Sequence, residues 1–455
     1  MGRVVIVSAD GHVGTQPEVY RDYIDTEYRD AIDDLISENQ EYLRLSSGIS
    51  EFAPDVLEVI DDRQAIRSGG LAAGWDMERR LRELDAEGVA GEVVLSGTQT
   101  STLPFFSVVN RRHPADLRWA GARAYHRWLA EQMQVGQGRL SAVADPGPCI
   151  DMKSTLAELK WVAEHGFVSV GVPGVIGDSS LPPLYDPYFE PFWAACSNLG
   201  LVLSTHAGWG QDQGGFFDFL EKLSVSGELD VDNQMAVLEE MSDELKSADD
   251  SPLALDIGPR RAMWLLMMSG VFDRHPELKL VLTEVRADWV PATLRYLDAW
   301  FDGSRSSAKK KPSEYWVSNC LATPSGIHIS EIEMRHEIGV RQMMFGTDFP
   351  HPEGTWPNTQ DWIRAAFADV PEDEARLMLG ANAIACYHLD GAKLAAVAAE
   401  IGPELGEVLG GHVVDEAKID HFHKRSGYRR PAEEIDTGQL DRALRWDEAG
   451  LAQVG

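Results

Sequence analysis

Short apolar runs bounded by turn-forming residues recur along the chain and predict β-strands. In the run from Lys279 to Thr283, hydrophobic residues follow one another without alternating with polar ones. This pattern is typical of parallel strands that are covered on both faces. Eight strands are expected, at residues 4–10, 91–97, 140–146, 168–174, 201–207, 279–285, 316–323 and 342–348.

Amphipathic helical patterns fill many of the intervals between these strands. Helices are expected at residues 76–88, 115–134, 151–165, 187–199, 258–273 and 289–302. Strands and helices that alternate in this way predict an α/β fold, specifically a (β/α)8 TIM barrel. The active site of such a barrel lies at the carboxyl ends of its strands.

Two long segments exceed what a minimal barrel needs, at residues 14–75 and 209–257. Excursions of this kind on the catalytic face usually form a lid or a substrate pocket. We therefore expect one barrel domain, residues 1–390, that carries both insertions. Residues 391–455 are expected to form a C-terminal extension, which begins with an alanine-rich helix and packs on the barrel or on a neighbouring subunit.

Composition narrows the class of protein. The 455 residues are 44% hydrophobic, which is enough for a large core. The formal net charge of −32, from 73 acidic and 41 basic residues, argues against a nucleic-acid groove and against binding to an anionic membrane. Four cysteines without a CxxC spacing are expected to be reduced, mostly buried thiols. Without a signal segment or a long uncharged apolar stretch, a cytoplasmic enzyme is expected.

Metal-binding side chains end several of the expected strands. Asp10 and His12 close the first strand, and alternation of side chains along a strand places both on one face. His206 ends the fifth expected strand and Asp348 the eighth. Any one of them alone would be explained by a turn or a helix cap. Together, at one mouth of a barrel, imidazole and carboxylate groups predict a site for zinc, manganese or iron.

The order of these residues resembles the amidohydrolase superfamily, and within it the amidohydrolase-related branch that includes the aminocarboxymuconate-semialdehyde decarboxylases. The resemblance covers roughly residues 4–390 and includes the segments 84–89, 270–276, 289–291 and, above all, 346–352. It implies that Asp10, His12, His206 and Asp348 are the metal ligands. It also implies that Asp348 takes a proton from the attacking water.

One departure from this branch bears on the chemistry. Its decarboxylases typically place a histidine after strand six, where this chain has Glu284. With His351, Glu284 raises the number of possible ligands to six, enough for two ions. The centre would then hold zinc if it has one ion, and iron, manganese or both if it has two. Two other interpretations remain open, a salt bridge of Glu284 to Arg286 or another arginine and a hydrogen bond from His351 to Asp348.

Residues that contact the substrate are harder to assign. Arginines in or just beyond the first excursion are candidates, because a guanidinium binds a carboxylate through two hydrogen bonds. Trp209 is a candidate for an aromatic pocket, and Asn319 for a hydrogen bond either to substrate or to its neighbours in the fold. The arginines considered are Arg63 and Arg67, followed by Arg79 and Arg80.

These features favour a metal-dependent hydrolase that activates water and acts on a small, carboxylate-bearing compound. Three alternatives remain. The first is a dinuclear iron or iron–manganese oxygenase that hydroxylates a small organic or amino acid, and the second is a non-oxidative decarboxylase. The third is a catalytically silent subunit beside a homologous barrel. A homodimer is the expected assembly, or a heteromer with such a barrel.

Overall fold

The computed structural model describes most of the chain. The described residues are 2–50, 54–98, 101, 103–106, 113–173, 181–207, 257–301, 307–411, 413–425, 444, 445, 447 and 451. The second predicted excursion, with Trp209, lies outside them up to residue 256.

Seven parallel strands form one sheet in which each strand pairs with the next along the chain. They are β1 (Ile6–Val13), β2 (Val89–Ser96), β3 (Leu140–Ala144), β4 (Phe167–Gly171), β5 (Val202–His206), β6 (Leu280–Thr283) and β7 (Cys320–Thr323). Nearly all of their residues are buried, as expected for strands covered on both faces.

The segment 343–349 closes the sheet between β7 and β1. Met344 N donates to Ala322 O (2.9 Å) on one side, and Ala9 N donates to Phe345 O (2.8 Å) on the other. The predicted TIM barrel is therefore confirmed. The eighth predicted strand is irregular, because this segment makes only isolated bridges to its two neighbours.

The seventh predicted strand is also partly wrong. Residues Pro312–Asn319 form helix α12, and only Cys320–Thr323 are extended. Pro312 stands at the first helical position, and the side chain of Glu314 accepts a hydrogen bond from Lys311 N (2.8 Å). These two helix-start signals override the apolar pattern of residues 316–319.

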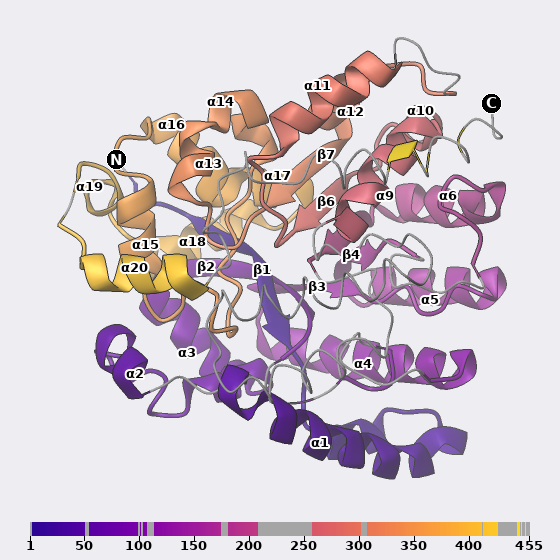
Figure 1. Ribbon diagram of the computed structural model, residues 1–455. Helices are drawn as coiled ribbons and strands as arrows, with labels where there is room; N and C mark the ends of the chain where they lie inside the picture. The colour runs from indigo at the N-terminus through magenta and orange to yellow at the C-terminus, as the bar shows by residue number, and fades with distance from the viewer. Residues whose placement is uncertain are drawn as a thin grey trace.

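Helices follow the strands and cover the outside of the barrel (Figure 1). Those near the predicted positions are α3 (Met77–Glu87), α4 (Ala115–Val135), α5 (Met152–Glu164), α6 (Glu190–Leu199), α9 (Ile257–Met268), α10 (Val271–Arg274) and α11 (Val290–Phe301). Helix α3 shows why the prediction succeeds. The side chain of Asp76 accepts from Arg79 N (2.9 Å) at its start, and Gly88 ends it with φ +71°.

Further helices occupy the first excursion and the segments around the later strands. They are η1 (Pro17–Asp22), η2 (Thr26–Ala31), α1 (Ile32–Ser50), α2 (Pro54–Ile60), η3 (Gly70–Gly74), η4 (Pro187–Phe189), α13 (Ile329–Glu333), α14 (Arg335–Ile338), η5 (Val340–Gln342), α15 (Thr359–Ala366), α16 (Glu372–Arg376), η6 (Leu377–Ala381) and α17 (Asn382–Cys386).

The described part of the C-terminal extension packs on the barrel of its own chain. It contains α18 (Gly391–Ile401), α19 (Leu405–Val408) and α20 (Glu416–Arg425). Leu394 and Ala398 of α18 are buried in a cluster with side chains from the strands. Val4 N donates to Pro403 O (2.9 Å), which ties the start of β1 to the residues after α18. A division of the chain at residue 390 stays a prediction.

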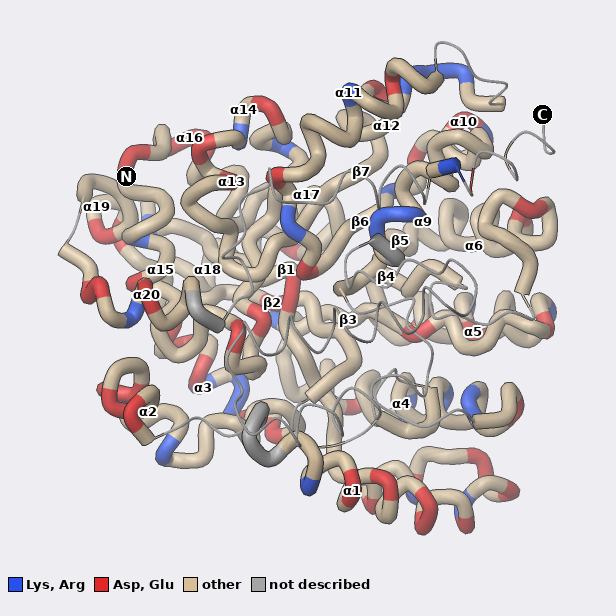
Figure 2. The backbone as a smooth tube through the Cα atoms, viewed as in Figure 1, with Lys and Arg blue, Asp and Glu red and all other residues tan. Residues whose placement is uncertain are grey.

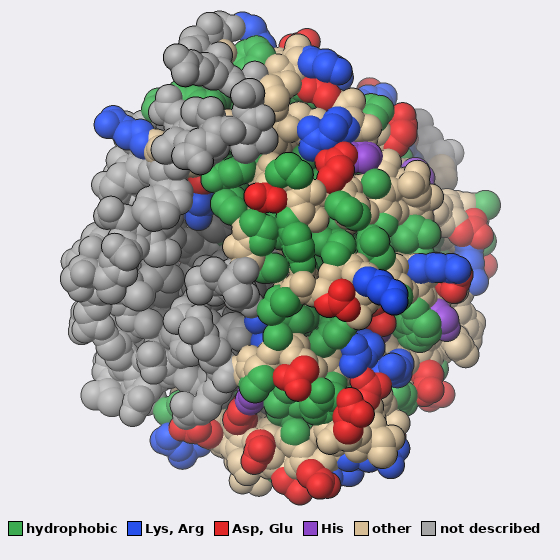
Figure 3. All heavy atoms as spheres, turned by 90° about the vertical axis from the view of Figure 1, so that its right-hand side faces the viewer, with side chains coloured by type: hydrophobic (Ala, Val, Ile, Leu, Met, Phe, Trp, Pro, Cys, Tyr) green, Lys and Arg blue, Asp and Glu red, His purple; other side chains and the backbone are tan. Residues whose placement is uncertain are grey.

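The surface agrees with the composition. Acidic positions follow one another along α1 and α2 (Figure 2), whereas the face seen in Figure 3 mixes acidic, basic and hydrophobic side chains. All four cysteines are buried and free of disulfides, as predicted. No described helix combines the length and apolar composition needed to cross a bilayer.

Candidate metal centre

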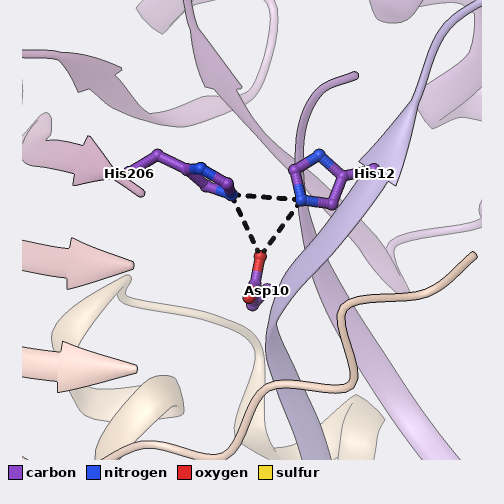
Figure 4. A group of neighbouring side chains, drawn as sticks. All are labelled: Asp10, His12 and His206. Atoms are coloured by element: carbon purple, nitrogen blue, oxygen red, sulfur yellow. Dashed lines mark hydrogen bonds and ion pairs between the residues drawn. The ribbon is translucent and has the colours of Figure 1, made fainter. Parts of the chain in front are cut away.

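Asp10, His12 and His206 converge at the mouth of the barrel (Figure 4). The Nε2 atoms of the two histidines lie 3.1 Å apart. Asp10 Oδ1 lies 3.5 Å from His12 Nε2 and 3.8 Å from His206 Nε2. All three residues are at most 6% exposed, and Asp10 Oδ1 accepts no hydrogen bond within the described part of the chain. A buried carboxylate oxygen without a donor, facing two imidazole nitrogens, fits a divalent cation.

Hydrogen bonds on the outer side hold these ligands in place. His206 Nδ1 lies 2.8 Å from Ala207 O, which leaves Nε2 directed to the centre. The Ser325 hydroxyl donates to Asp10 Oδ2 (2.8 Å), so Oδ1 faces the histidines. Gly97 approaches His12 so closely that an added Cβ would lie 2.8 Å from Nδ1, and its φ of +146° also favours glycine. Such outer contacts orient metal ligands and tune their affinity.

Asp348 and His351 adjoin this group from the segment that closes the barrel. Asp348 Oδ1 lies 3.2 Å from His12 Nε2 and 3.1 Å from His351 Nδ1. The rings of His12 and His351 stack with their centroids 4.0 Å apart. Asp348 is fully buried, and among the described residues neither of its carboxylate oxygens has a hydrogen-bond donor. The carboxylate therefore also fits a ligand to a cation.

Glu284 reaches the same centre from the end of β6. Its Oε2 lies 3.1 Å from His206 Nε2, whereas Arg286 pairs with Asp288. Glu284 and Asp348 both have positive φ, +55° and +56°. This conformation is costly for residues other than glycine and is concentrated at functional sites, which supports a role for both carboxylates.

One acidic residue at the centre was not predicted. Carboxylate oxygens of Glu353, Glu284 and Asp348 all lie within 4.8 Å of one another. Glu353 follows His351 by two residues, in a turn rather than at the end of a strand. The sequence signal of a metal-binding side chain at a strand end therefore does not apply to it.

Burial and charge shift the pKa values of the central groups in different directions. Burial raises the pKa of Asp348 to about 7, although His351 opposes this effect. Burial also acts to raise the pKa of Asp10, yet the pKa of Asp10 is lowered, because the neighbouring imidazoles of His12 and His206 favour its carboxylate. Burial lowers the pKa of His12. Burial also opposes the charge of His206, but Asp10 outweighs it and raises the pKa of His206.

The arginines proposed to bind substrate are paired within the fold. Arg63 pairs with Glu87, and Arg67 donates to Leu57 O (3.0 Å) while its guanidinium lies 3.7 Å from Asp61. Arg79 donates to Glu83 (2.6 Å). These contacts give the arginines structural partners and do not support their role at a substrate carboxylate.

Arg80 has a clear structural position instead. It is fully buried and donates to Glu92 Oε2 (2.6 Å). The same guanidinium donates to His12 O (2.8 Å) and to Phe349 O (3.1 Å). Arg80 therefore joins the end of β1 to the segment that carries Asp348.

Asn319 lies at the wrong end of the barrel for contact with substrate. It ends α12 directly before β7, whereas the metal-binding residues lie at the carboxyl ends of the strands. Its side-chain amide donates to Pro276 O (3.0 Å) and Leu278 O (2.8 Å). This position supports the second prediction for Asn319, a hydrogen bond to its neighbours in the fold.

A parallel barrel with imidazole and carboxylate side chains gathered at its mouth defines the class of metal-dependent barrel enzymes. Within that class, the family profile described as Amidohydrolase matches residues 110–389, and the chain belongs to this family. It lies in the branch of the aminocarboxymuconate-semialdehyde decarboxylase-like enzymes, as the sequence motifs predict.

Several known relatives of the chain are decarboxylases. Gamma-resorcylate decarboxylase of Rhizobium sp. strain MTP-10005 is 27% identical over 335 residues, which cover 69% of this chain and 88% of that protein. The structure of 5-carboxyvanillate decarboxylase from Sphingomonas paucimobilis has 20% identity and a TM-score of 0.55, over 85% of this chain and 99% of that one. Dihydroxybenzoic acid decarboxylase from Polaromonas sp. JS666, solved with bound manganese, has 19% identity and a TM-score of 0.53, over 86% and 99% of the chains.

These relatives correct the functional prediction. The preference for a hydrolase is wrong, and the oxygenase alternative loses its support, because the relatives named here are decarboxylases. Glu284 in place of the expected histidine weakens the decarboxylase interpretation but does not exclude it. Zinc and iron are likewise not indicated, whereas manganese occurs in the Polaromonas structure. A divalent-metal-dependent enzyme of the amidohydrolase superfamily is what remains established.

Proposed function

We propose that this protein is a manganese-dependent, non-oxidative decarboxylase of a small hydroxylated aromatic acid. One observation carries the proposal: a buried cluster of two histidines and two carboxylates with unsatisfied oxygens, in a chain related to decarboxylases over most of its length. The acidic surface does not oppose an anionic substrate, because a cation at the mouth would supply positive charge locally.

Asp10, His12, His206 and Asp348 would hold the ion. Manganese accepts both carboxylate and imidazole ligands, so the donor set suits it. When bound, the ion would act as a Lewis acid that holds oxygen atoms of the substrate and withdraws electron density from the ring. The side chains that would hold it come from β1, β5 and the segment that closes the barrel.

The reaction requires one proton and consumes neither water nor O2. The carbon–carbon bond to the carboxylate breaks, CO2 leaves, and a proton replaces it on the same ring carbon. We assign delivery of this proton to Glu284, whose side chain is 20% exposed at the mouth and contacts His206. His351 contacts Asp348 and is placed to exchange a proton with it.

The test is turnover under anaerobic conditions with protein loaded with manganese. 2,6-Dihydroxybenzoate and 5-carboxyvanillate are suitable first substrates, with CO2 and the arene product as readouts. In D2O, the product should carry one deuterium at the carbon that lost the carboxylate. The proposal would be contradicted if CO2 release depended on O2, or if the protein converted none of the hydroxyaryl acids in a broad panel.

Three variants separate chemistry from folding. Asp348→Asn should abolish turnover, because it removes a charged oxygen from the centre. Asp369→Asn makes the same change at an exposed position and should leave turnover unchanged. Glu284→Gln should retain manganese and lose turnover if Glu284 supplies the proton. Wild-type turnover in Glu284→Gln would remove that assignment.

A further inference from the structure

Helix α20 lies beyond residue 389, where the family match ends, yet it packs close to the metal centre. In Figure 1 it runs beside α15, the first helix after the segment that carries Asp348 and His351. It also contacts α2 of the first excursion. Three of its side chains account for this position, Lys418, Phe422 and His423.

Phe422 is the residue that brings α20 nearest to a metal ligand. Its side chain is buried, and its ring lies 3.9 Å from that of Trp362, centroid to centroid. A Cβ added to Gly326 would lie 2.7 Å from Phe422 Cζ, so the ring rests directly against the backbone of Gly326. The preceding residue, Ser325, donates its hydroxyl hydrogen to Asp10 Oδ2 (2.8 Å). Phe422 therefore contacts the residue next to Ser325, whose hydroxyl orients Asp10.

Polar contacts hold the two sides of α20. Lys418 Nζ lies 2.8 Å from Asp62 Oδ2 and 3.3 Å from Asp361 Oδ2, and its side chain is only 10% exposed. His423 Nδ1 lies 3.0 Å from His328 Nε2, in the same segment after β7 as Ser325. The helix is thus fixed to the first excursion, to α15 and to the segment after β7.

The segment that follows the metal-binding residues also faces α20. Pro352, Gly354 and Thr355 line a cavity together with Ile419 and Phe422. This segment folds back on itself, because Thr355 N donates to Thr347 O (2.9 Å) and Gly354 N donates to His351 O (3.1 Å). A shift of α20 would therefore affect both segments that support the centre, one at Asp10 and one at Asp348 and His351.

We propose that α20 is a positioning element of the metal centre, with Phe422 as its principal positioning residue. Docked α20 holds Ser325 and the segment 348–355 in the arrangement in which the ligands converge. Because binding free energies are reciprocal, manganese must then favour the docked helix by the same factor by which the docked helix favours manganese. The inference concerns the metal centre of the proposed decarboxylase but requires no turnover for its test.

The first experiment measures manganese affinity in the full-length protein, by titration followed with electron paramagnetic resonance. Phe422→Ala should weaken manganese binding by about tenfold, within the usual range of coupling between sites. Phe422→Leu, which refills most of the volume, should restore much of the affinity. Asp420→Ala changes an exposed residue of the same helix and should bind manganese like the wild type. Wild-type affinity in folded Phe422→Ala would overturn the proposal.

The second experiment needs no variant, so it holds even if Phe422→Ala does not fold. Amide hydrogen exchange is compared in wild-type protein with manganese and after chelation. Exchange in α20 should slow on addition of manganese by a larger factor than exchange in α5, on the remote side of the barrel, which follows only the stabilisation of the fold as a whole. Equal exchange of α20 in both states would contradict the coupling. Both readouts are independent of substrate, so failure of the decarboxylase proposal would be seen separately, as absent turnover with metal binding intact.

Discussion

At the scale of single residues, the centre depends on hydrogen bonds from groups that do not bind metal themselves. Ser325 illustrates this, because its hydroxyl donates a hydrogen bond to Asp10 Oδ2 and leaves Oδ1 facing His12 and His206. A carboxylate that is free to rotate can present either oxygen to the ion. Affinity for the metal falls when only one of these arrangements suits the ion.

Ser325→Ala should therefore weaken manganese binding by about 10- to 100-fold, the range typical of outer partners of metal ligands. The fold should persist, because only one hydroxyl is removed. Metal affinity measured by titration checks this, with Ser37→Ala as a control at an exposed position of α1. An unchanged affinity would show that Asp10 is oriented by other contacts.

The sequence signal for a candidate site residue is clearest where a side chain ends a strand. Asp10, His12 and His206 were found because strand periodicity and chemistry agreed, and the structure brings them together. Glu353 was missed because it lies in a turn, where no periodicity marks the direction of a side chain. Arg63 and Arg67 were proposed from chemistry alone, and their acidic neighbours in the fold were not apparent from sequence.

At the scale of elements, apolar patterns located strands well but did not define their ends. Residues 316–319 carry an apolar pattern, yet the helix-start signals at Pro312 and Glu314 make them helical. Residues 342–348 bond to both neighbours through isolated bridges without regular pairing, and the segment ends at Asp348, whose φ is positive. The conformation of residues 342–348 thus depends on hydrogen bonds to residues distant in sequence, such as Ala322 and Ala9, which a local apolar pattern does not reveal.

Glu331 of α13 shows how elements are joined near the mouth. Its carboxylate accepts from Ala287 N (2.6 Å), after β6, and from His328 N (2.7 Å), after β7. Burial, with Asp288 nearby, raises the pKa of Glu331 to about 7 from 4.5. Between pH 4.5 and about pH 7, Glu331 therefore keeps its proton in the folded protein, whereas the same side chain has released its proton in the unfolded chain. Ionisation of Glu331 therefore favours unfolding, and its contribution to stability falls as pH rises through this window.

Glu331→Gln should remove this part of the pH dependence, because glutamine stays neutral. The free energy of unfolding of the wild type should fall between about pH 5 and about pH 7.5 more steeply than that of the variant. Urea unfolding at the two pH values measures the difference. Glu337→Gln, at an exposed position nearby, should behave like the wild type. Parallel pH profiles for wild type and Glu331→Gln would contradict the assignment.

At the scale of the whole molecule, the metal centre joins segments from both ends of the chain. Asp10 and His12 come from the first strand, and Asp348 and His351 from the segment that closes the barrel against it. Arg80 adds a buried link between these two regions through His12 O and Phe349 O. An ion at the centre would therefore act on the closure of the barrel as well as on the substrate.

Manganese should accordingly stabilise the entire fold. A ligand that binds only the folded state adds about 2.7 kcal/mol to the free energy of unfolding at a hundredfold excess over its Kd. Without the ion, burial and the nearby charge of Asp10 disfavour the carboxylate of Asp348 and raise its pKa, so ionisation of Asp348 opposes folding. Thermal unfolding should occur at a lower temperature after chelation, and the unfolding temperature should recover when manganese is restored.

His206→Ala should lose this dependence on manganese, since it removes a ligand while leaving β1 intact, whereas Asp369→Asn should keep it. Equal unfolding temperatures with and without manganese would indicate that the cluster at the mouth does not bind it.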